Sequence, residues 1–208
     1  ANGELWIGTK GSGLCRLNRR QKTFTYYRYD PDNPKSLSSN LVWSIHEDKN
    51  GGLWIGTVDG GVNRLDKKTG AFIRYQHDPQ NPQSLNHNGI YSVYADMNGS
   101  IWIGTFGGGL NRLDPNTGRV IHYTDRDGLP DNYVKGILPD ANGNLWLSTD
   151  RGLSKLVLRP DSIGKGSNPQ TRVFRNFTVK DGLISNQFLS GAYYKSQDGR
   201  LFLAVKEG

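Results

Sequence analysis

One fourteen-residue pattern recurs along this chain, and this recurrence constrains the fold more than any other feature. It occurs as LWIGTKGSGLCRLN at 5–18, as LWIGTVDGGVNRLD at 53–66 and as IWIGTFGGGLNRLD at 101–114, with a weaker copy, LWLSTDRGLSKLV, at 145–157. The motif tryptophans are therefore 48, 48 and 44 residues apart, and Phe202 takes the same place 56 residues further on. A period of roughly 40–50 residues is typical of stacked supersecondary units.

Each repeat divides into four short segments of strand-forming residues. In the copy at 40–78 they are NLVWSIHE, LWIGT, VNRLD and AFIRYQHD, separated by DKNG, VDGG and KKTG. Asn-Gly tolerates positive φ and Asp can bond the backbone ahead of it, so these separators predict tight turns. No segment keeps a 3.6-residue apolar period. The pattern predicts an all-β chain, a β-propeller made of four-stranded antiparallel blades.

The copies also predict where the blades lie. Residues 1–208 form a single propeller segment with complete blades at about 40–78, 88–125 and 132–179, and partial blades at 1–29 and 186–208. A seven-bladed ring would need on the order of 300 residues or more at this period. Because an open ring exposes sheet edges, we expect either a fragment of a longer protein or an association of two copies.

Composition excludes several classes of protein. The single cysteine, Cys15, rules out an internal disulfide framework and a multi-cysteine metal site. No stretch approaches the ~18 apolar residues of a membrane helix. The N-terminal ANGELWIGTK is not a signal peptide, and it begins within a motif, so we expect a longer parent. The formal charge of +7 invites an acidic partner without naming one.

The linkers between blades share one residue. They read DPDNPKSLSSN, DPQNPQSLNHN, DRDGLPDN and VKDGLISN, and each ends in an asparagine: Asn40, Asn88, Asn132 and Asn186. A side chain that closes a turn by bonding the backbone would explain this recurrence.

The pattern DxxGxLWIGTxxGGLxRLD with DGLxxN linkers resembles the two-component regulator propeller repeat, over nearly the whole chain. Such repeats build the extracytoplasmic sensor regions of hybrid two-component histidine kinases and related bacterial signalling proteins. The resemblance implies a periplasmic location and a membrane attachment only through the parent's anchor. Its best-known members respond to carbohydrate, which implies an oligosaccharide or other small-molecule ligand.

Most recurring residues have a structural explanation. The glycine-rich loops are followed by a strand and not by the helix that a dinucleotide site requires, so they predict turns. The motif tryptophans are expected to pack between blades, with sugar stacking as the alternative. DKNGG, DMNGS and DANGN lack the further acidic ligands of a calcium loop and indicate Asx-type turns.

The basic residues of the motif, Arg16, Arg64, Arg112 and Lys155, recur on the third strand. Their spacing favours a solvated or inter-blade ion-pair position, and anion binding is the alternative. The charges are spread around the ring and form no continuous track, so we expect no nucleic-acid partner.

Neither a nucleophile motif nor a zinc motif accompanies the four histidines. We therefore predict no catalytic residues, no metal and no cofactor. A polysaccharide lyase or hydrolase stays open, because propellers can gather catalytic residues from several blades.

Residues that differ between copies are the better candidates for a ligand site. Loops that lead into the innermost strand and loops between the second and third strands emerge on one face of a propeller. Trp43 lies on an innermost strand, where the other blades carry Tyr91, Lys135 and Leu189. The candidate ligand-binding residues are Trp43, Asp59, His87, Tyr91, Phe106, Tyr133, Asp150 and Arg151. Their aromatic members would stack on a sugar, while Asp59, Asp150 and Arg151 would bond its hydroxyls.

The leading functional hypothesis is a ligand-sensing propeller of a bacterial receptor that signals to a downstream kinase or other output module. A protein-interaction scaffold, including a homodimer, is the second hypothesis, and a polysaccharide-active enzyme is the third.

Overall fold

The computed structural model describes residues 4–158 and 173–206, and within them five antiparallel sheets follow one another in chain order. The first sheet has three strands: β1 (Glu4–Gly8), β2 (Leu14–Asn18) and β3 (Thr23–Tyr27). The second has four: β4 (Val42–Glu47), β5 (Leu53–Thr57), β6 (Val62–Leu65) and β7 (Phe72–Tyr75). The third has four: β8 (Ile90–Ala95), β9 (Ile101–Thr105), β10 (Leu110–Leu113) and β11 (Val120–Tyr123).

The last two sheets complete the chain. The fourth sheet comprises β12 (Val134–Pro139), β13 (Leu145–Thr149), β14 (Leu153–Val157) and β15 (Val173–Phe177). The fifth comprises β16 (Phe188–Lys195) and β17 (Leu201–Val205). Part of the predicted 132–179 blade, residues 159–172, lies outside the described residues. The three four-stranded sheets confirm the propeller blades that the repeat predicted.

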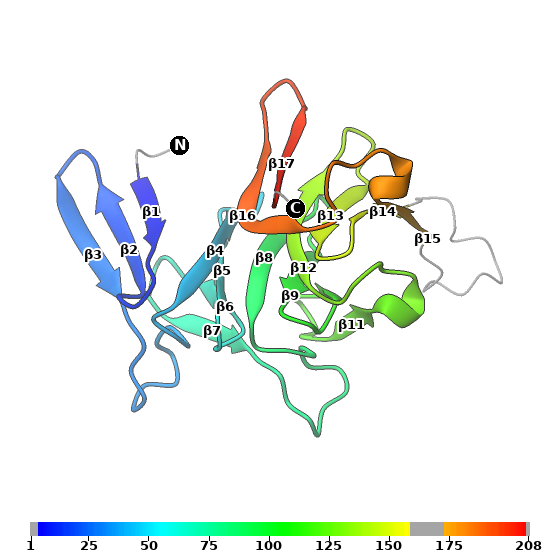
Figure 1. The fold of residues 1–208 in the computed structure, drawn as a ribbon. Coiled ribbons are helices and arrows are strands. Elements are labelled where there is room, and N and C mark those ends of the chain that lie inside the picture. Colours follow the sequence, from blue (N-terminus) through cyan, green and yellow to red (C-terminus); the bar gives the residue numbers. More distant parts are fainter. Residues whose placement is uncertain (1–3, 159–172, 207–208) are drawn as a thin grey trace.

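Figure 1 shows the sheets arranged around a common centre, with β1–β3 in blue at one side and β12–β15 at the other. The innermost strands β4, β8, β12 and β16 are in contact with their neighbours there. Tyr193 of β16 lies at this centre, where β16 is in contact with β12. Its ring lies against Gly136 of β12, where a Cβ would come within 2.7 Å of it.

The hydrophobic core is divided into clusters that lie between blades. One cluster combines Trp54 and Val62 of the β4–β7 blade with Ile90, Val93 and Ile103 of the next. A second joins Trp102 to the β12–β15 blade in the same way. Burying both faces of a sheet explains why the strands do not alternate cleanly between apolar and polar residues. The predicted inter-blade packing is confirmed for Trp54 and Trp102, and Trp6 packs against a third cluster, whereas Trp146 is in none of the three and stacks on Phe177 of its own blade.

The side chains of the linker asparagines bond the backbone, as predicted. Asn88 Oδ1 accepts a 2.7 Å hydrogen bond from the backbone N–H of His77, at the end of its linker. The backbone carbonyl of Asn88 accepts a 2.8 Å bond from Gly61, in the turn of the preceding blade. Asn40, Asn132 and Asn186 repeat the side-chain bond, at 2.9, 2.9 and 2.8 Å.

The last two linkers each contain one 3₁₀ turn, η1 (Asp125–Asp127) and η2 (Val179–Asp181). Both end at a glycine in the left-handed region, Gly128 and Gly182, with φ of 107° and 100°. An L side chain would be strained there. This is the physical reason for the glycine in the DGL sequence that these two linkers share.

Candidate functional site

Each complete blade has a β-bulge near the start of its innermost strand. The register of β4 against β5 shifts by one residue between Val42 and Ser44, which leaves Trp43 in the bulge. The same shift leaves Tyr91 in a bulge of β8 and Lys135 in a bulge of β12. A bulge frees the extra residue from the alternation of the sheet and re-aims its side chain. Trp43, Tyr91 and Lys135, which differ between blades, therefore occupy a position that strand pairing constrains less than the rest of the strand.

Three aromatic rings meet at this end of the blades. Tyr91 and Phe106 stack with ring centroids 3.6 Å apart and an interplanar angle of 30°. Trp43 meets both edge-on, at 6.3 Å from Tyr91 and 6.2 Å from Phe106, and remains 39% exposed. The rings come from β4, from β8 and from the loop after β9, so two blades build the cluster. We call Trp43, Tyr91 and Phe106 the aromatic cluster.

Tyr133 and His87 lie at the edge of the aromatic cluster. Phe106 and Tyr133 form an isolated antiparallel bridge, and Tyr133 is 43% exposed. A Cβ on Gly89 would lie 2.6 Å from Phe106 Cδ2 and 3.0 Å from His87 Cε1, so glycine makes room for both rings. The N–H of Gly89 donates to His87 Nδ1 at 2.8 Å. In the neutral ring this bond leaves the proton on Nε2, free to donate.

An ion pair adds polar groups beside the rings. Lys135 Nζ donates to Asp150 Oδ1 and to the backbone carbonyl of Phe188 at 2.8 Å. Burial, together with smaller contributions from the charges of Asp150 and Tyr133, raises the pKa of Tyr91 to about 12. Tyr91 therefore keeps its hydroxyl proton across the physiological range. The place thus offers donors, acceptors and an exposed aromatic face within one small region.

Not every candidate joins this region. Asp59 and Arg151 are exposed on loops of the same face, but among the described residues no side-chain hydrogen bond or ion pair joins either of them to the aromatic cluster. Lys135, by contrast, pairs directly with Asp150 and was absent from the candidate set. Its sequence signal was present, because Lys135 stands at the position of Trp43 and Tyr91.

The opposite end of the blades is formed by residues that recur from repeat to repeat. Asp48 closes the β4–β5 turn by accepting bonds from the N–H groups of Asn50 and Gly52, and its other oxygen accepts from Trp54 Nε1 at 2.9 Å. Burial alone would raise the pKa of Asp48, but these hydrogen bonds outweigh it and the pKa is lowered. Asp96 and Trp102 repeat the bond at 2.8 Å. The Asx-type turns predicted from DKNGG and DMNGS are confirmed.

The recurring cations stack on the motif tryptophans. The guanidinium carbons of Arg16, Arg64 and Arg112 lie 5.8, 5.5 and 5.6 Å from the ring centroids of the cross-strand tryptophans, and Lys155 Nζ lies 5.2 Å from that of Trp146. We expected a solvated or inter-blade ion-pair position: among the described residues none of these four cations pairs with another blade, and all four are partly exposed. The ion pairs that do form, Arg16 with Glu4 and Lys155 with Asp140, are within a blade. The antiparallel register places each cation opposite its tryptophan, which favours the cation–π contact.

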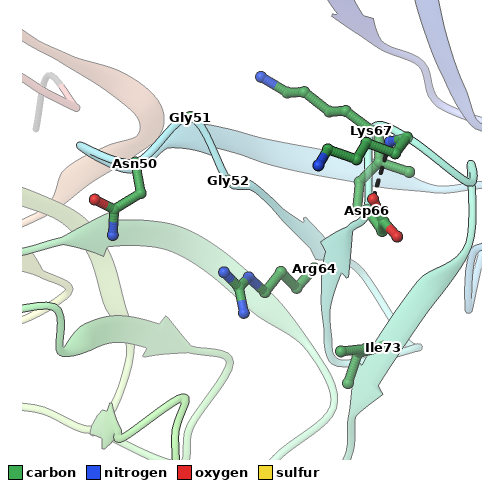
Figure 2. A pocket seen from close by; sticks show the side chains of 9 residues that line it. Asn50, Gly51, Gly52, Arg64, Asp66, Lys67 and Ile73 are labelled. Atoms are coloured by element: carbon green, nitrogen blue, oxygen red, sulfur yellow. Dashed lines mark hydrogen bonds between the residues drawn. The ribbon is translucent and has the colours of Figure 1, made fainter.

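A surface hollow of about 490 Å³ lies at this end of the β4–β7 blade (Figure 2). It is lined by the β4–β5 turn at Asn50 to Gly52, by Arg64 and by the turn that begins at Asp66. A larger hollow of about 890 Å³ surrounds Arg112 in the next blade. Within 4–158 and 173–206, no three His, Cys, Asp or Glu side chains gather where they could hold a metal ion.

These features define a β-propeller segment whose blades are alike at the hairpin end and differ at the bulge end. Three segments, residues 36–59, 84–107 and 128–151, match the two-component regulator propeller family. In these three segments the match confirms the resemblance to the two-component regulator propeller repeat that the motifs predicted. No curated protein matches the chain.

Solved structures of similar proteins agree with this family. The extracellular domains of two hybrid two-component systems from B. thetaiotaomicron are similar over 99% of the chain, with 28% and 26% identity and a TM-score of 0.76 each. The chain spans 25% and 27% of those two structures. Virginiamycin B lyase from Staphylococcus aureus is similar over 98% of the chain and 60% of its own length, with 18% identity and a TM-score of 0.69. That last similarity is one of fold.

Within the part of the chain that the structure describes, no helix has the length and hydrophobicity that a membrane crossing requires.

Proposed function

We propose that this chain is a ligand-sensing propeller segment of an extracytoplasmic receptor and that the aromatic cluster binds a neutral oligosaccharide. The support for a receptor comes from the family match and from the similar extracellular domains of hybrid two-component systems. The kinase or other output module would belong to the parent protein, and the location would be periplasmic.

The observation that carries the carbohydrate proposal is the exposed Trp43 ring beside bonded polar groups. Sugar rings present flat C–H faces that pack on aromatic rings, and their hydroxyls need donors and acceptors nearby. Trp43 supplies the face, while the Tyr91 hydroxyl and the Lys135–Asp150 pair supply both kinds of polar group. Because that pair is neutral overall, the cluster favours an uncharged sugar over an anionic one.

Calorimetry of the full chain against a panel of neutral oligosaccharides tests this proposal. We expect Trp43→Ala to weaken binding at least tenfold, because the stacking face is lost. Tyr26→Ala is the matched control, since Tyr26 is also exposed, at 57%, but lies on β3 away from the cluster. Absence of binding heat with every oligosaccharide, or equal losses in the two variants, would contradict the proposal.

A second candidate function, self-association, is favoured by the terminal sheets. Phe24 and Tyr26 of β3 and Tyr194 and Phe202 of the β16–β17 sheet are 52–60% exposed, unlike the aromatic residues between complete blades. Either the adjoining blades of a longer parent or a second copy of the chain would cover such surfaces. Sedimentation velocity over a concentration series would detect self-association, and a monomer at all concentrations would argue against this candidate.

A further inference from the structure

The hollow in Figure 2 differs from its counterparts in one repeat position. The residue that precedes the Leu-Trp or Ile-Trp pair of the motif is Glu4, Gly52, Ser100 and Asn144 in successive blades. In three blades this residue has a polar side chain. In the β4–β7 blade it has none.

In the other blades this position serves the stacked cation. Glu4 Oε1 accepts from Arg16 Nη1 at 3.3 Å. Ser100 Oγ accepts from Arg112 Nε at 3.0 Å and from Nη2 at 2.9 Å.

In the β12–β15 blade a neighbouring carboxylate provides the acceptor for the stacked cation. Asn144 Nδ2 donates to Asp140 Oδ2 at 3.0 Å, and the same oxygen pairs with Lys155 Nζ at 3.0 Å. Three blades therefore provide each stacked cation with an acceptor from the same part of the blade.

Arg64 lacks such an acceptor. It stacks on Trp54, but across residues 4–158 and 173–206 no hydrogen bond or ion pair is formed by its guanidinium. The negative charge of Asp48 interacts with Arg64 at longer range, but its carboxylate oxygens are bonded to Trp54 Nε1 and to the turn backbone. Figure 2 shows the Arg64 guanidinium extending beneath the Gly51–Gly52 turn toward Asn50. Its donors thus lie on the side of the turn where Gly52 stands, beside the Asp48 carboxylate.

Cationic side chains outnumber acidic ones among the residues that line the hollow. Lys67 and Lys68 line the hollow with Arg64, and Asp66 is the acidic residue among the lining groups. The Asp66 carboxylate is bonded to the N–H of Lys68 and the hydroxyl of Thr69, while Lys67 pairs with Glu47. Lys68 is exposed, and within the described chain its amine forms no ion pair. Arg64 and Lys68 are therefore the groups available to a ligand.

We propose that this hollow binds a single oxyanion group, a carboxylate or a sulfate or phosphate, through paired N–H bonds from Arg64. The fixed fork of a guanidinium matches such groups bidentately. The ligand oxygen would take the place that Ser100 Oγ fills beside Arg112. The hollow lies at the opposite end of β4 and β5 from Trp43, so this site does not depend on the carbohydrate proposal.

Sulfate titration of the ¹⁵N-labelled full chain, at ionic strength held constant with chloride, tests the site through the Arg64 Nε–Hε resonance. We expect a saturable shift in the wild-type protein. In Gly52→Ser the new hydroxyl would accept hydrogen bonds from Arg64, as Ser100 Oγ accepts them from Arg112. The apparent affinity for sulfate should then fall at least fivefold. A Cβ at Gly52 would come within 2.5 Å of Asp48 Oδ2, so that carboxylate must shift slightly. Ser100, beside the equivalent Asp96, shows that the blade accommodates a serine there.

Two further variants distinguish the effect of the added hydroxyl from the effect of the added Cβ. Gly52→Ala adds the same Cβ without an acceptor and should retain more of the sulfate response than Gly52→Ser. Ser100→Gly removes the acceptor of Arg112 and should create a second saturable response at the Arg112 resonance. Linear, non-saturating shifts, or identical affinities in wild type and Gly52→Ser, would overturn the proposal.

A last comparison identifies the source of the oxyanion. Glucuronate and glucose 6-sulfate are titrated beside inorganic sulfate under the same conditions. Tighter binding of either sugar would indicate a group carried on a saccharide, and equal or tighter binding of sulfate would indicate a free ion. Either result supports the oxyanion site, whereas no saturable binding of any of the three would refute it.

Discussion

Trp54 and Trp43 lie on neighbouring strands of the same blade, yet their surroundings are opposite. Trp54 is fully buried, bonds Asp48 through its indole N–H and contacts both Arg64 and Tyr75. Trp43 lies in a bulge and is 39% exposed. Trp102 repeats the first arrangement, while the second position changes from blade to blade. A residue's role in this fold thus follows from its place in the repeat more than from its type.

The largest expected effect comes from the repeated tryptophan. Trp54→Ala removes a fully buried ring from the inter-blade core, and such a change typically costs about 3–5 kcal/mol of unfolding free energy. Urea unfolding followed by circular dichroism measures it. A cost below about 1 kcal/mol would show that the blades do not depend on this ring.

The linker asparagine should have an intermediate effect. Asn88→Ala leaves the N–H of His77 without its 2.7 Å partner at the junction of two blades, and we expect a loss of about 1–2 kcal/mol. Asn116→Ala is the control, because Asn116 is exposed and only its backbone N–H is bonded, to Asp114. Equal unfolding midpoints for the two variants would contradict the role of Asn88.

Asp140 should contribute a pH-dependent part. Burial would raise its pKa, but hydrogen bonds from Asn144 and Lys155 outweigh this and lower the pKa to about 2. Since the folded pKa lies below the unfolded value, its stabilisation is present above about pH 4 and is lost as the pH falls toward 2. Asp140→Asn should cost about 1 kcal/mol at pH 7, because solvent screens the pair. The difference from wild type, measured by urea unfolding at several pH values, should shrink below pH 4, and a constant difference would refute this.

The smallest expected effect on stability comes from the bulge tryptophan. Trp43→Ala should lower the unfolding free energy by less than about 1 kcal/mol, because the ring is partly exposed and outside the inter-blade clusters. Its intrinsic fluorescence should respond to ligand, while that of Trp54 should not. If Trp43→Ala and Trp54→Ala destabilise equally, the contrast between the two ends of the blade fails.

Much of the fold could be predicted because the same structural signal recurs at equivalent positions of several repeats. Four linkers ending in asparagine indicated a backbone bond, and the structure has it in all four. The stacking of the cations was not predicted, because periodicity gives the position of Arg64 but not its cross-strand neighbour. That neighbour is set by the antiparallel register, which pairs Trp54 with Arg64.

The candidate site was predictable only in part. Variation between copies pointed to Trp43, Tyr91 and Phe106, which the structure brings into contact. The bulge that re-aims Trp43 and Tyr91 leaves no recognisable letter in the sequence, since it is one extra residue in an otherwise regular strand. Asp59 and Arg151 were chosen because they differ between loops, and difference alone does not fix where a flexible side chain lies.

The bulge also has a consequence for how this fold can change. A paired strand residue has a partner across the sheet, so replacing it usually demands a matching replacement elsewhere. Trp43, Tyr91 and Lys135 have no such partner, and three chemically unrelated side chains occupy that slot within one chain. Each complete blade thus has one position, the bulge residue of its innermost strand, that can change while the rest of the blade stays the same. Duplicating a blade and substituting this one residue would alter the side chains exposed on this face while leaving the packing between blades unchanged.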